Sequence, residues 1–347
     1  MRDDRTISMK LLITGGAGFI GSNFIRYILK TYPEDRVINF DKLTYAGNLE
    51  NLKDIEKDER YRFIKGDVCD FAALKQAAVG VDAIVHFAAE SHVDRSIHSS
   101  REFLETNILG TQNVIDVVRE QGERGIRFIH IGTDEVYGDI ESPKKSKYGD
   151  PVIPSSPYSA SKAAADLLVM AAVRTFNLPA MITHCTNNYG PYQFPEKIVP
   201  LFISNAIENK PLPLYDGGTQ IRDWLYVEDH CRAVDLVLRK GKAGEVYDIA
   251  AENDPEVTNR MLTETILNIL GKDKSLIQEV SGLRPGHDQR YAVDASKIRT
   301  ELGWQPQISL AEGLKQTIKW YQDNQAWWRR VKTGEYQAYY NNHYNKS

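Results

Sequence analysis

Two short segments carry side chains whose types and spacing suit acid and base chemistry. Tyr158 and Lys162 form a Y-x-x-x-K pattern at the start of a predicted helix, where positions i and i+4 share one face. An ammonium beside a phenol stabilises the phenolate, so this pair could remove a proton near neutral pH. The run Thr133, Asp134 and Glu135 follows an apolar strand and offers two adjacent carboxyl groups as general acid and general base. Taken alone, the first pattern also fits a surface Tyr/Lys pair, and the second fits a capped helix start.

A glycine-rich segment nearer the start of the chain indicates a dinucleotide cofactor. Gly15, Gly18 and Gly21 have G-x-x-G-x-x-G spacing between an apolar strand and an amphipathic helix, although a glycine-rich turn without a ligand is the alternative. Glycine lets the backbone approach a pyrophosphate, which binds at the positive end of the helix dipole. Asp41 ends the second predicted strand, where it suits an adenosine ribose and repels the 2′-phosphate of NADP, so we expect NAD. Asp67 suits an adenine amino group or, alternatively, the N-cap of the next helix.

The elements that must position these residues alternate as βαβ units do. Short β-rich runs are separated by predicted helices near 20–30, 71–79, 101–121 and 158–176. Because the runs are continuously apolar, helices should cover both faces of the sheet. We therefore expect an α/β fold: a Rossmann-type doubly wound parallel sheet with a smaller, partly interleaved C-terminal substrate domain.

The texture of the chain changes after Cys185 to loops rich in Pro, Tyr and Asn, with one helical stretch near 197–209. We expect an NAD-binding Rossmann domain over residues 9–187 and a substrate domain over residues 188–347. A strand near 246–251 should return to the first sheet.

The composition excludes several classes of protein. The chain has 347 residues, 42% of them hydrophobic and 26% charged, and no apolar run approaches the ~18 residues of a membrane span. Its 43 basic and 47 acidic residues form no long block of like charge, which argues against nucleic-acid binding. Three distant cysteines without metal-ligand spacing indicate neither disulfides nor a metal site, and fit the cytoplasm. His86, His92, His130 and His184 are expected to be neutral, without catalytic roles, and residues 1–8 to be an extension rather than a targeting signal.

Seven segments together resemble the dTDP-glucose 4,6-dehydratases, a family of extended short-chain dehydrogenases/reductases. The segments are TGGAGFIGSNF, AESHVDRS, GTDEVYG, SPYSASKA, NNYGPYQFPEK, IRDWLYVEDH and RPGHD. They occur in the family's order between Met9 and about Trp328. The glycine and Y-x-x-x-K motifs mark only the superfamily, whereas TDEVYG with NNYGPYQFPEK is much narrower.

The resemblance implies a role for each matching residue. Thr133 would hydrogen-bond the sugar, Asp134 would protonate the leaving hydroxyl, and Glu135 would take the proton of carbon 5. Tyr158 would take the proton of the 4-hydroxyl, and Lys162 would also hold the nicotinamide ribose. The remaining cofactor contacts would be Phe19, Ile20, Asp41, Lys42, Leu43, Thr44, Asp67, Val68, Ala88, Ala89, Ser91, Thr106 and Asn188. The remaining substrate contacts would be Ser91, Asn187, Glu196, Lys197, Pro213, Leu214, Tyr215, Arg222, Asn259, Arg284 and His287.

The implied reaction converts dTDP-glucose to dTDP-4-keto-6-deoxyglucose. NAD would oxidise carbon 4, water would leave across carbons 5 and 6, and the hydride would return to carbon 6. A nucleotide-hexose 4-epimerase, a UDP-glucose 4,6-dehydratase and a non-catalytic NAD-binding regulator are the alternatives. An epimerase would leave Asp134 and Glu135 without a purpose.

The resemblance also implies a homodimer held by a four-helix bundle. The predicted helices near 101–121 and 158–176 carry wide apolar faces, which include Ile108, Val114, Val117, Ala164, Leu168 and Ala171. The alternative is that these faces only pack on the sheet.

Overall fold

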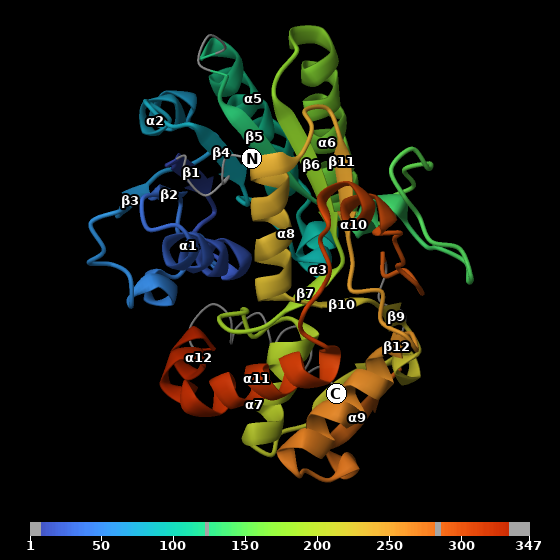
Figure 1. Cartoon of the computed structure of the whole chain (residues 1–347). Coiled ribbons are helices and arrows are strands. Elements are labelled where there is room, and N and C mark those ends of the chain that lie inside the picture. Colours follow the sequence, from blue (N-terminus) through green and yellow to red (C-terminus); the bar gives the residue numbers. More distant parts are fainter. Residues whose placement is uncertain (1–7, 122–124, 282–285, 333–347) are drawn as a thin grey trace.

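The computed structural model describes residues 8–121, 125–281 and 286–332, and is built around a seven-stranded parallel sheet (Figure 1). In spatial order the strands are β11 (Val246–Ile249), β6 (Ala180–Cys185), β5 (Arg127–Thr133), β4 (Ala83–His86), β1 (Lys10–Thr14), β2 (Arg36–Asp41) and β3 (Tyr61–Lys65). β1 and β4 are parallel neighbours, but the chain continues from β1 toward β2 on one side and from β4 toward β5 on the other, so the loops after these two strands separate and leave room for a ligand.

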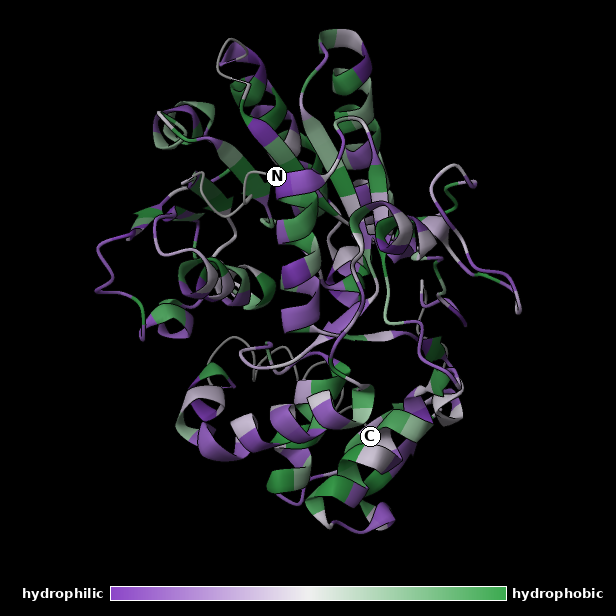
Figure 2. Ribbon diagram, viewed as in Figure 1, coloured by the Kyte–Doolittle hydropathy of each residue, from purple (hydrophilic) through white to green (hydrophobic). Residues whose placement is uncertain are grey.

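Helices cover both faces of this sheet, as the apolar strands predict. One face packs against α1 (Phe19–Thr31) and α8 (Val227–Lys240), and the other against α2 (Phe71–Ala77), α5 (Gly110–Glu120) and α6 (Pro157–Phe176). Leu11 and Ile13 of β1 belong to the first of these cores and Leu12 to the second, because successive side chains of a strand point to opposite faces. Figure 2 shows hydrophobic colour along the central strands and alternating stripes along α8. The predicted doubly wound α/β fold is confirmed.

The helix predicted near 101–121 is continuous but not uniform. It consists of α4 (Arg101–Phe103), the π-helical turn η3 (Leu104–Leu109) and α5, and it follows the short helix α3 (Val93–His98). The 3-10 turns are η2 (Leu49–Leu52), η5 (Asp134–Tyr137), η6 (Asp216–Gly218) and η7 (Lys274–Leu276). A π-turn inside a helix often lies at a functional site, and η3 contains Thr106, one of the predicted cofactor contacts.

A smaller part with its own apolar core lies below the carboxyl edge of the sheet in Figure 1. Its helices are α7 (Ile198–Ile207), α9 (Asn259–Leu270), α11 (Leu310–Asp323) and α12 (Gln325–Val331). Its two-stranded sheets pair β7 (Asn187–Tyr189) with β10 (Trp224–Tyr226), β9 (Ile221–Arg222) with β12 (Val257–Thr258), and β8 (Leu212–Tyr215) with β13 (Ile277–Val280). The chain passes between the two parts more than once. After forming part of the smaller unit it returns as α8 and β11, and later as α10 (Ser296–Leu302), to pack on the large sheet.

The apolar residues of α5 and α6 divide between the core and the surface. Val114 and Val117 are fully buried against the sheet, so their assignment to a face open to a second copy was wrong. Leu104, Leu109 and Leu167, by contrast, are 46%, 57% and 64% exposed.

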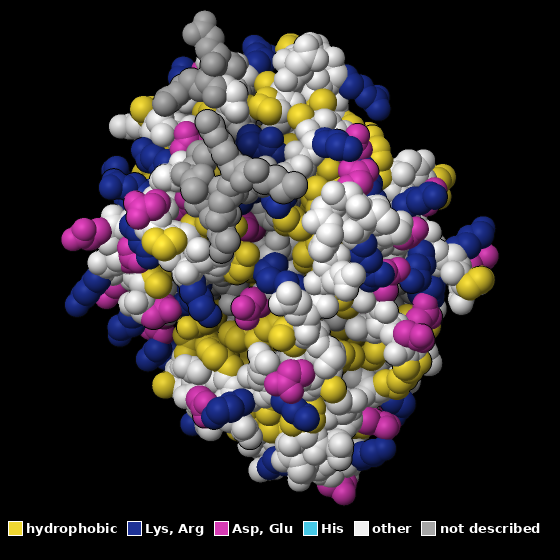
Figure 3. All heavy atoms as spheres, viewed as in Figure 1, with side chains coloured by type: hydrophobic (Ala, Val, Ile, Leu, Met, Phe, Trp, Pro, Cys, Tyr) yellow, Lys and Arg dark blue, Asp and Glu magenta, His cyan; other side chains and the backbone are white. Residues whose placement is uncertain are grey.

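In Figure 3, Lys and Arg side chains alternate with Asp and Glu across the visible face. Among the described residues, no helix is long and apolar enough to cross a membrane.

Candidate active site

A cavity of about 340 Å³, here called the first cavity, opens at the carboxyl ends of the central strands. Among the predicted cofactor residues it is lined by Gly15, Gly18, Phe19, Ile20, Gly21, Asp41, Lys42, Thr44, Asp67, Val68, Ala88, Ala89, Ser91, Thr106, Tyr158, Lys162 and Asn188. Among the predicted catalytic and substrate residues it is also lined by Thr133, Asp134, Glu135, Asn187, Glu196 and Lys197. Leu43 is not part of the lining. Its backbone N–H instead donates to Asp41 Oδ1 at 2.7 Å.

Gly15 and Gly21 of the glycine loop pack too closely for a larger residue. Gly15 has a φ of +70°, and a Cβ there would lie 2.6 Å from the backbone nitrogen of Ala88. A Cβ on Gly21 would lie 2.4 Å from the carbonyl oxygen of Gly15. Gly18 is the N-cap of α1, whose first turn receives no side-chain cap in the described structure. Backbone N–H groups at this positive helix end therefore remain available to an anion in the first cavity.

Two acidic residues border the same end of the first cavity. The carboxylate of Asp41 accepts the backbone N–H of Ala17 at 2.9 Å, and burial raises its pKa. Asp67 pairs with Lys42 at 2.7 Å. The alternative in which Asp67 caps the next helix is excluded, because Asp70 is the N-cap of α2.

The carboxyl pair lies in η5, directly after β5. Thr133 caps this turn by accepting the backbone N–H of Glu135 at 3.3 Å, so neither carboxyl group is the cap. The Thr133 hydroxyl also donates to Asp134 Oδ1, while Asp134 Oδ2 is buried without a hydrogen-bond partner among the described residues. Burial, reinforced by Glu135, raises the pKa of Asp134 well above its usual range. Burial also raises the pKa of Glu135, but Lys197 and Arg222 oppose that shift.

Tyr158 and Lys162 lie on one buried face of α6, as the motif predicts. The predicted lowering of the Tyr158 pKa was wrong for the protein by itself: burial, and next the Glu135 carboxylate, raise it well above the ordinary value. The Lys162 ammonium donates to the carbonyl oxygen of Ile131 at 2.6 Å and lies 3.3 Å from His130 Nε2. Burial lowers the pKa of Lys162 to about 8. The lysine is therefore held mainly by β5.

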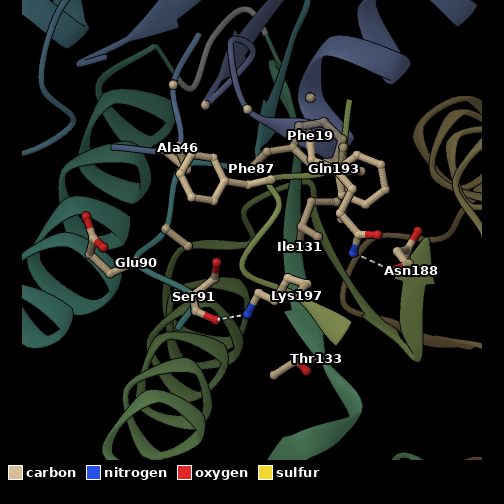
Figure 4. A pocket seen from close by; sticks show the side chains of 18 of the residues that line it. Phe19, Ala46, Phe87, Glu90, Ser91, Ile131, Thr133, Asn188, Gln193 and Lys197 are labelled. Atoms are coloured by element: carbon tan, nitrogen blue, oxygen red, sulfur yellow. Dashed lines mark hydrogen bonds between the residues drawn. The ribbon is translucent and has the colours of Figure 1, made fainter. Parts of the chain in front are cut away.

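Figure 4 shows two hydrogen bonds that order the wall of the first cavity. Lys197 Nζ donates to the carbonyl oxygen of Ser91, and Gln193 Nε2 donates to that of Asn188, each at 2.9 Å. The sequence interpretation missed Gln193, and it also missed the lining residues Tyr45, Phe87, Phe194, Cys185, Thr186 and Trp224. Gln193 and Phe194 lie inside the quoted motif NNYGPYQFPEK, which was the available signal.

A second cavity of about 370 Å³ adjoins the first, and Glu196 and Ile198 line both. It gathers the remaining predicted substrate residues, Pro213, Leu214, Tyr215, Arg222, Asn259 and His287, with the apolar side chains of Leu201 and Phe202. Arg284 lies outside the described residues. Burial raises the pKa of Glu196 to about 7. Arg222 donates to the backbone carbonyls of Ile221, Asp288 and Gln289 and stacks over Tyr291, which fixes its guanidinium at the cavity wall.

The histidines differ in charge. His86 lies between the hydroxyls of Thr14 and Thr111, and burial lowers its pKa well below the ordinary value. Burial also lowers the pKa of His130, to about 4, so both rings are neutral as expected. The neutral state expected for His184 was wrong: burial acts to lower its pKa, but Asp166 and Asp248 flank the ring and together raise the pKa to about 10. His92 caps α3 and lies 3.7 Å from Glu196. The described residues contain no cluster suited to a metal ion.

Comparison with known proteins places this geometry in a family. Residues 12–317 match the family model described as GDP-mannose 4,6 dehydratase. A dTDP-glucose 4,6-dehydratase of Shigella flexneri is 48% identical, and the alignment covers 97% of this chain and 99% of that protein. The chain belongs to the dTDP-glucose 4,6-dehydratase family. A crystal structure of the dTDP-glucose 4,6-dehydratase from Streptomyces venezuelae, with NAD and TYD bound, is 49% identical with a TM-score of 0.89, covering 93% of this chain and 100% of that one.

A relative with a different activity is more distant. The UDP-glucose 4-epimerase of Thermus thermophilus, solved with NAD, is 26% identical with a TM-score of 0.82, covering 91% of this chain and 100% of that one. The fold is thus common to dehydratases and epimerases, whereas the sequence of this chain is more similar to the dTDP-glucose 4,6-dehydratases.

Proposed function

We propose that this chain is an NAD-dependent dTDP-glucose 4,6-dehydratase, a hydro-lyase that forms dTDP-4-keto-6-deoxyglucose. The observation that carries the proposal is the meeting, in one cavity, of the Tyr158–Lys162 pair with the buried carboxyl pair of Asp134 and Glu135. A 4-epimerase needs the first pair but has no use for the second. Relatives that are 48% and 49% identical to this chain carry the same activity in their names.

The glycine loop, the uncapped first turn of α1 and the Asp41 carboxylate fit a dinucleotide with an unphosphorylated ribose. When bound, NAD supplies the hydride acceptor and returns the same hydride, and its oxidised ring adds a positive charge that favours a phenolate. Lys162 adds a second positive charge from α6. In the protein by itself a hydrogen bond with Thr133 already opposes the burial that raises the pKa of Tyr158, and these two charges would add to that effect.

The residues of the first cavity then divide the reaction between them. Tyr158 accepts the proton of the 4-hydroxyl while carbon 4 is oxidised, and the resulting ketone acidifies carbon 5. Glu135, whose negative charge Lys197 and Arg222 favour, removes that proton. Asp134 is kept protonated by burial and by Glu135, and gives its proton to the leaving 6-hydroxyl.

The proton count shows what must be reset after each turnover. Glu135 returns its proton to carbon 5 when the hydride reaches carbon 6. At the end Tyr158 holds the proton of the 4-hydroxyl, and Asp134 has lost one to water. A proton must therefore leave Tyr158 and another must reach Asp134 before the next cycle.

The two cavities suggest how the substrate lies. The hexose would occupy the first cavity near Thr133 and Asn187, and the nucleotide the second, where Tyr215 can stack on the base and Arg222 faces the diphosphate. We propose a cofactor domain over residues 9–187, whose sheet β11 rejoins, and an interleaved nucleotide-sugar domain over residues 188–347. We further propose a cytoplasmic homodimer, in which the exposed leucines around α5 and α6 form the contact with a second copy.

One assay tests the proposed activity. The purified chain is incubated separately with dTDP-glucose and with UDP-glucose, and the alkali-induced absorbance of a 4-keto-6-deoxy sugar is followed. We expect product from dTDP-glucose without added cofactor, since NAD is regenerated in each turnover. If only UDP-glucose gave product, the substrate would be UDP-glucose and not dTDP-glucose. Formation of a 4-epimer without keto sugar would overturn the dehydratase assignment.

A further inference from the structure

Four buried titratable side chains behind Lys162 have no part in the proposed chemistry. They are His130 on β5, Asp166 on α6, His184 on β6 and Asp248 on β11, and none is more than 8% exposed. None of the four lines either cavity. Burying several ionisable groups is costly unless each is paired, so their grouping calls for a reason.

The group is connected to the active site through Lys162. Tyr158, Lys162 and Asp166 occupy positions i, i+4 and i+8 of α6, and so share one face of the helix. His130 Nε2 lies 3.3 Å from Lys162 Nζ and 3.3 Å from Asp166 Oδ1. One neutral ring therefore stands between the ammonium and the carboxylate.

The far side of Asp166 is fixed by His184. Asp166 Oδ2 lies 3.1 Å from His184 Nε2, and His184 Nδ1 lies 3.2 Å from Asp248 Oδ1. The Tyr137 hydroxyl is 3.0 Å from both His184 Nδ1 and Asp248 Oδ1. These contacts join α6, β6, β11 and η5 around a single imidazole.

The backbone of β5 makes room for this arrangement. A Cβ on Gly132 would lie 2.5 Å from His184 Cδ2 and 3.2 Å from Asp166 Oδ1. Glycine at this strand position is unfavourable by itself, because it packs no side chain and costs backbone entropy. Its presence lets the carboxylate and the ring approach the strand.

The charges alternate through the group. Asp166 and Asp248 raise the pKa of His184 to about 10, so the ring is protonated at neutral pH. His184 in turn holds the pKa of Asp166 below its usual range, against the effect of burial. Burial lowers the pKa of Lys162, and the Asp166 carboxylate acts in the opposite direction. Asp166 thus favours the charged form of Lys162, while His184 holds Asp166 in place and, as a cation, offsets part of its negative charge.

We propose that Asp166, anchored by His184, is the counter-ion that keeps the buried ammonium of Lys162 charged and in position beside Tyr158. Asp166 and His184 are positioning residues, since they act only through Lys162. This inference rests on the proposed function of Lys162. The titratable groups around the lysine are Tyr158 and Asp166 on α6, His86 on β4, His130 on β5, and Cys185 and His184 on β6.

The first test replaces Asp166 with asparagine and follows kcat and KM for dTDP-glucose against pH. Without the negative charge, Lys162 loses its proton more easily, so the alkaline limb of kcat should move down by about one pH unit. KM should stay near the wild-type value, because Asp166 lines neither cavity. The matched control is Asp235→Asn, which removes another buried carboxylate, one that is paired with Arg239 and Tyr32 away from the site. The control should lower the melting temperature and leave the pH profile unchanged.

The second test uses a change of opposite sign. In His184→Gln, Asp166 remains ionised at alkaline pH but no longer faces a cation on its other side. Its field then acts more strongly on Lys162, and the alkaline limb should move up. If Asp166→Asn does not fold, the position of the alkaline limb in His184→Gln tests the proposal by itself.

The proposal is overturned if the alkaline limb stays at the wild-type pH in the variants that fold, whatever their melting temperatures. A wild-type chain that makes no keto sugar from dTDP-glucose would instead refute the proposed function. The two failures are therefore distinguishable.

Discussion

At the scale of single residues, Asp134 and Glu135 are neighbours in the chain, but their carboxyl groups have different electrostatic surroundings. Asp134 has one oxygen without a hydrogen-bond partner among the described residues, and burial together with Glu135 favours its protonated form. Glu135 has Lys197 and Arg222 as opposing charges. Different surroundings can give adjacent carboxyls the roles of acid and base, as the proposed elimination requires.

The double variant Asp134→Asn, Glu135→Gln tests this division of labour. It keeps size and hydrogen-bonding shape but removes both proton transfers, so carbon 4 should still be oxidised and reduced cofactor should accumulate. Product formation should fall by roughly 10²–10⁴ for each lost acid or base. Nicotinamide absorbance after adding dTDP-glucose measures the accumulation. Tyr158→Phe is the matched comparison and should give no reduced cofactor, while near-normal turnover in the double variant would refute the roles of the two carboxyls.

His184 predicts a specific dependence of stability on pH. Its pKa is raised in the folded protein to about 10 from the ordinary value of 6.5, so its contribution is fully present below pH 6.5 and is lost as the pH rises toward 10. The difference in free energy of unfolding between the wild type and His184→Gln should therefore be larger at pH 6.5 than at pH 9.5. Urea unfolding at both values measures it. A difference that grew with pH would show that the ring is neutral in the folded state.

At the scale of elements, the junction of β1 and α1 is the most constrained. In Gly21→Ala the new Cβ would meet the carbonyl oxygen of Gly15, so the helix end or the loop must move, which would disturb the proposed pyrophosphate site. We expect a marked loss of the NAD released on denaturing the purified chain. Gly303→Ala is the control: its φ is +70°, but no atom lies within 4 Å of the added Cβ. Gly303→Ala should lower the free energy of unfolding by roughly 1 kcal/mol and keep its NAD. Equal NAD contents in the two variants would refute the role of Gly21 in the cofactor site.

Prediction from sequence succeeded for features that depend on a single helix, strand or loop. The strands and main helices follow from periodicity, and the glycine loop from its place between β1 and α1. It failed where several elements meet. The charge of His184 depends on carboxylates from α6 and β11, and the fixed guanidinium of Arg222 depends on carbonyls some 66 residues further on. Likewise, helical periodicity groups Val114 and Val117 on one apolar face of α5, but it does not show whether the sheet or a second copy covers that face.

At the scale of the whole molecule, the exposed leucines of η3 and α6 predict a dimer. Light scattering at micromolar concentration should give about twice 39.4 kDa. The double variant Leu109→Lys, Leu167→Lys places two charges in the proposed contact and should shift the mass toward the monomer, because buried unpaired charges are costly. Met261→Lys on α9, where Met261 is 42% exposed, is the control and should leave the mass unchanged. A wild-type mass of 39.4 kDa would refute the dimer.

The parallel pairing of β11 with β6 has a consequence for how the chain reaches its native state during synthesis. The strand at this edge of the sheet consists of residues 246–249, so β6 has no neighbour on that side until the ribosome has made the chain that far. Until then the backbone from Ile182 to Cys185 presents unpaired N–H and C=O groups, and an open strand edge readily pairs with another chain. A fragment ending at residue 187 should therefore aggregate, whereas one that extends through β11 can close the sheet.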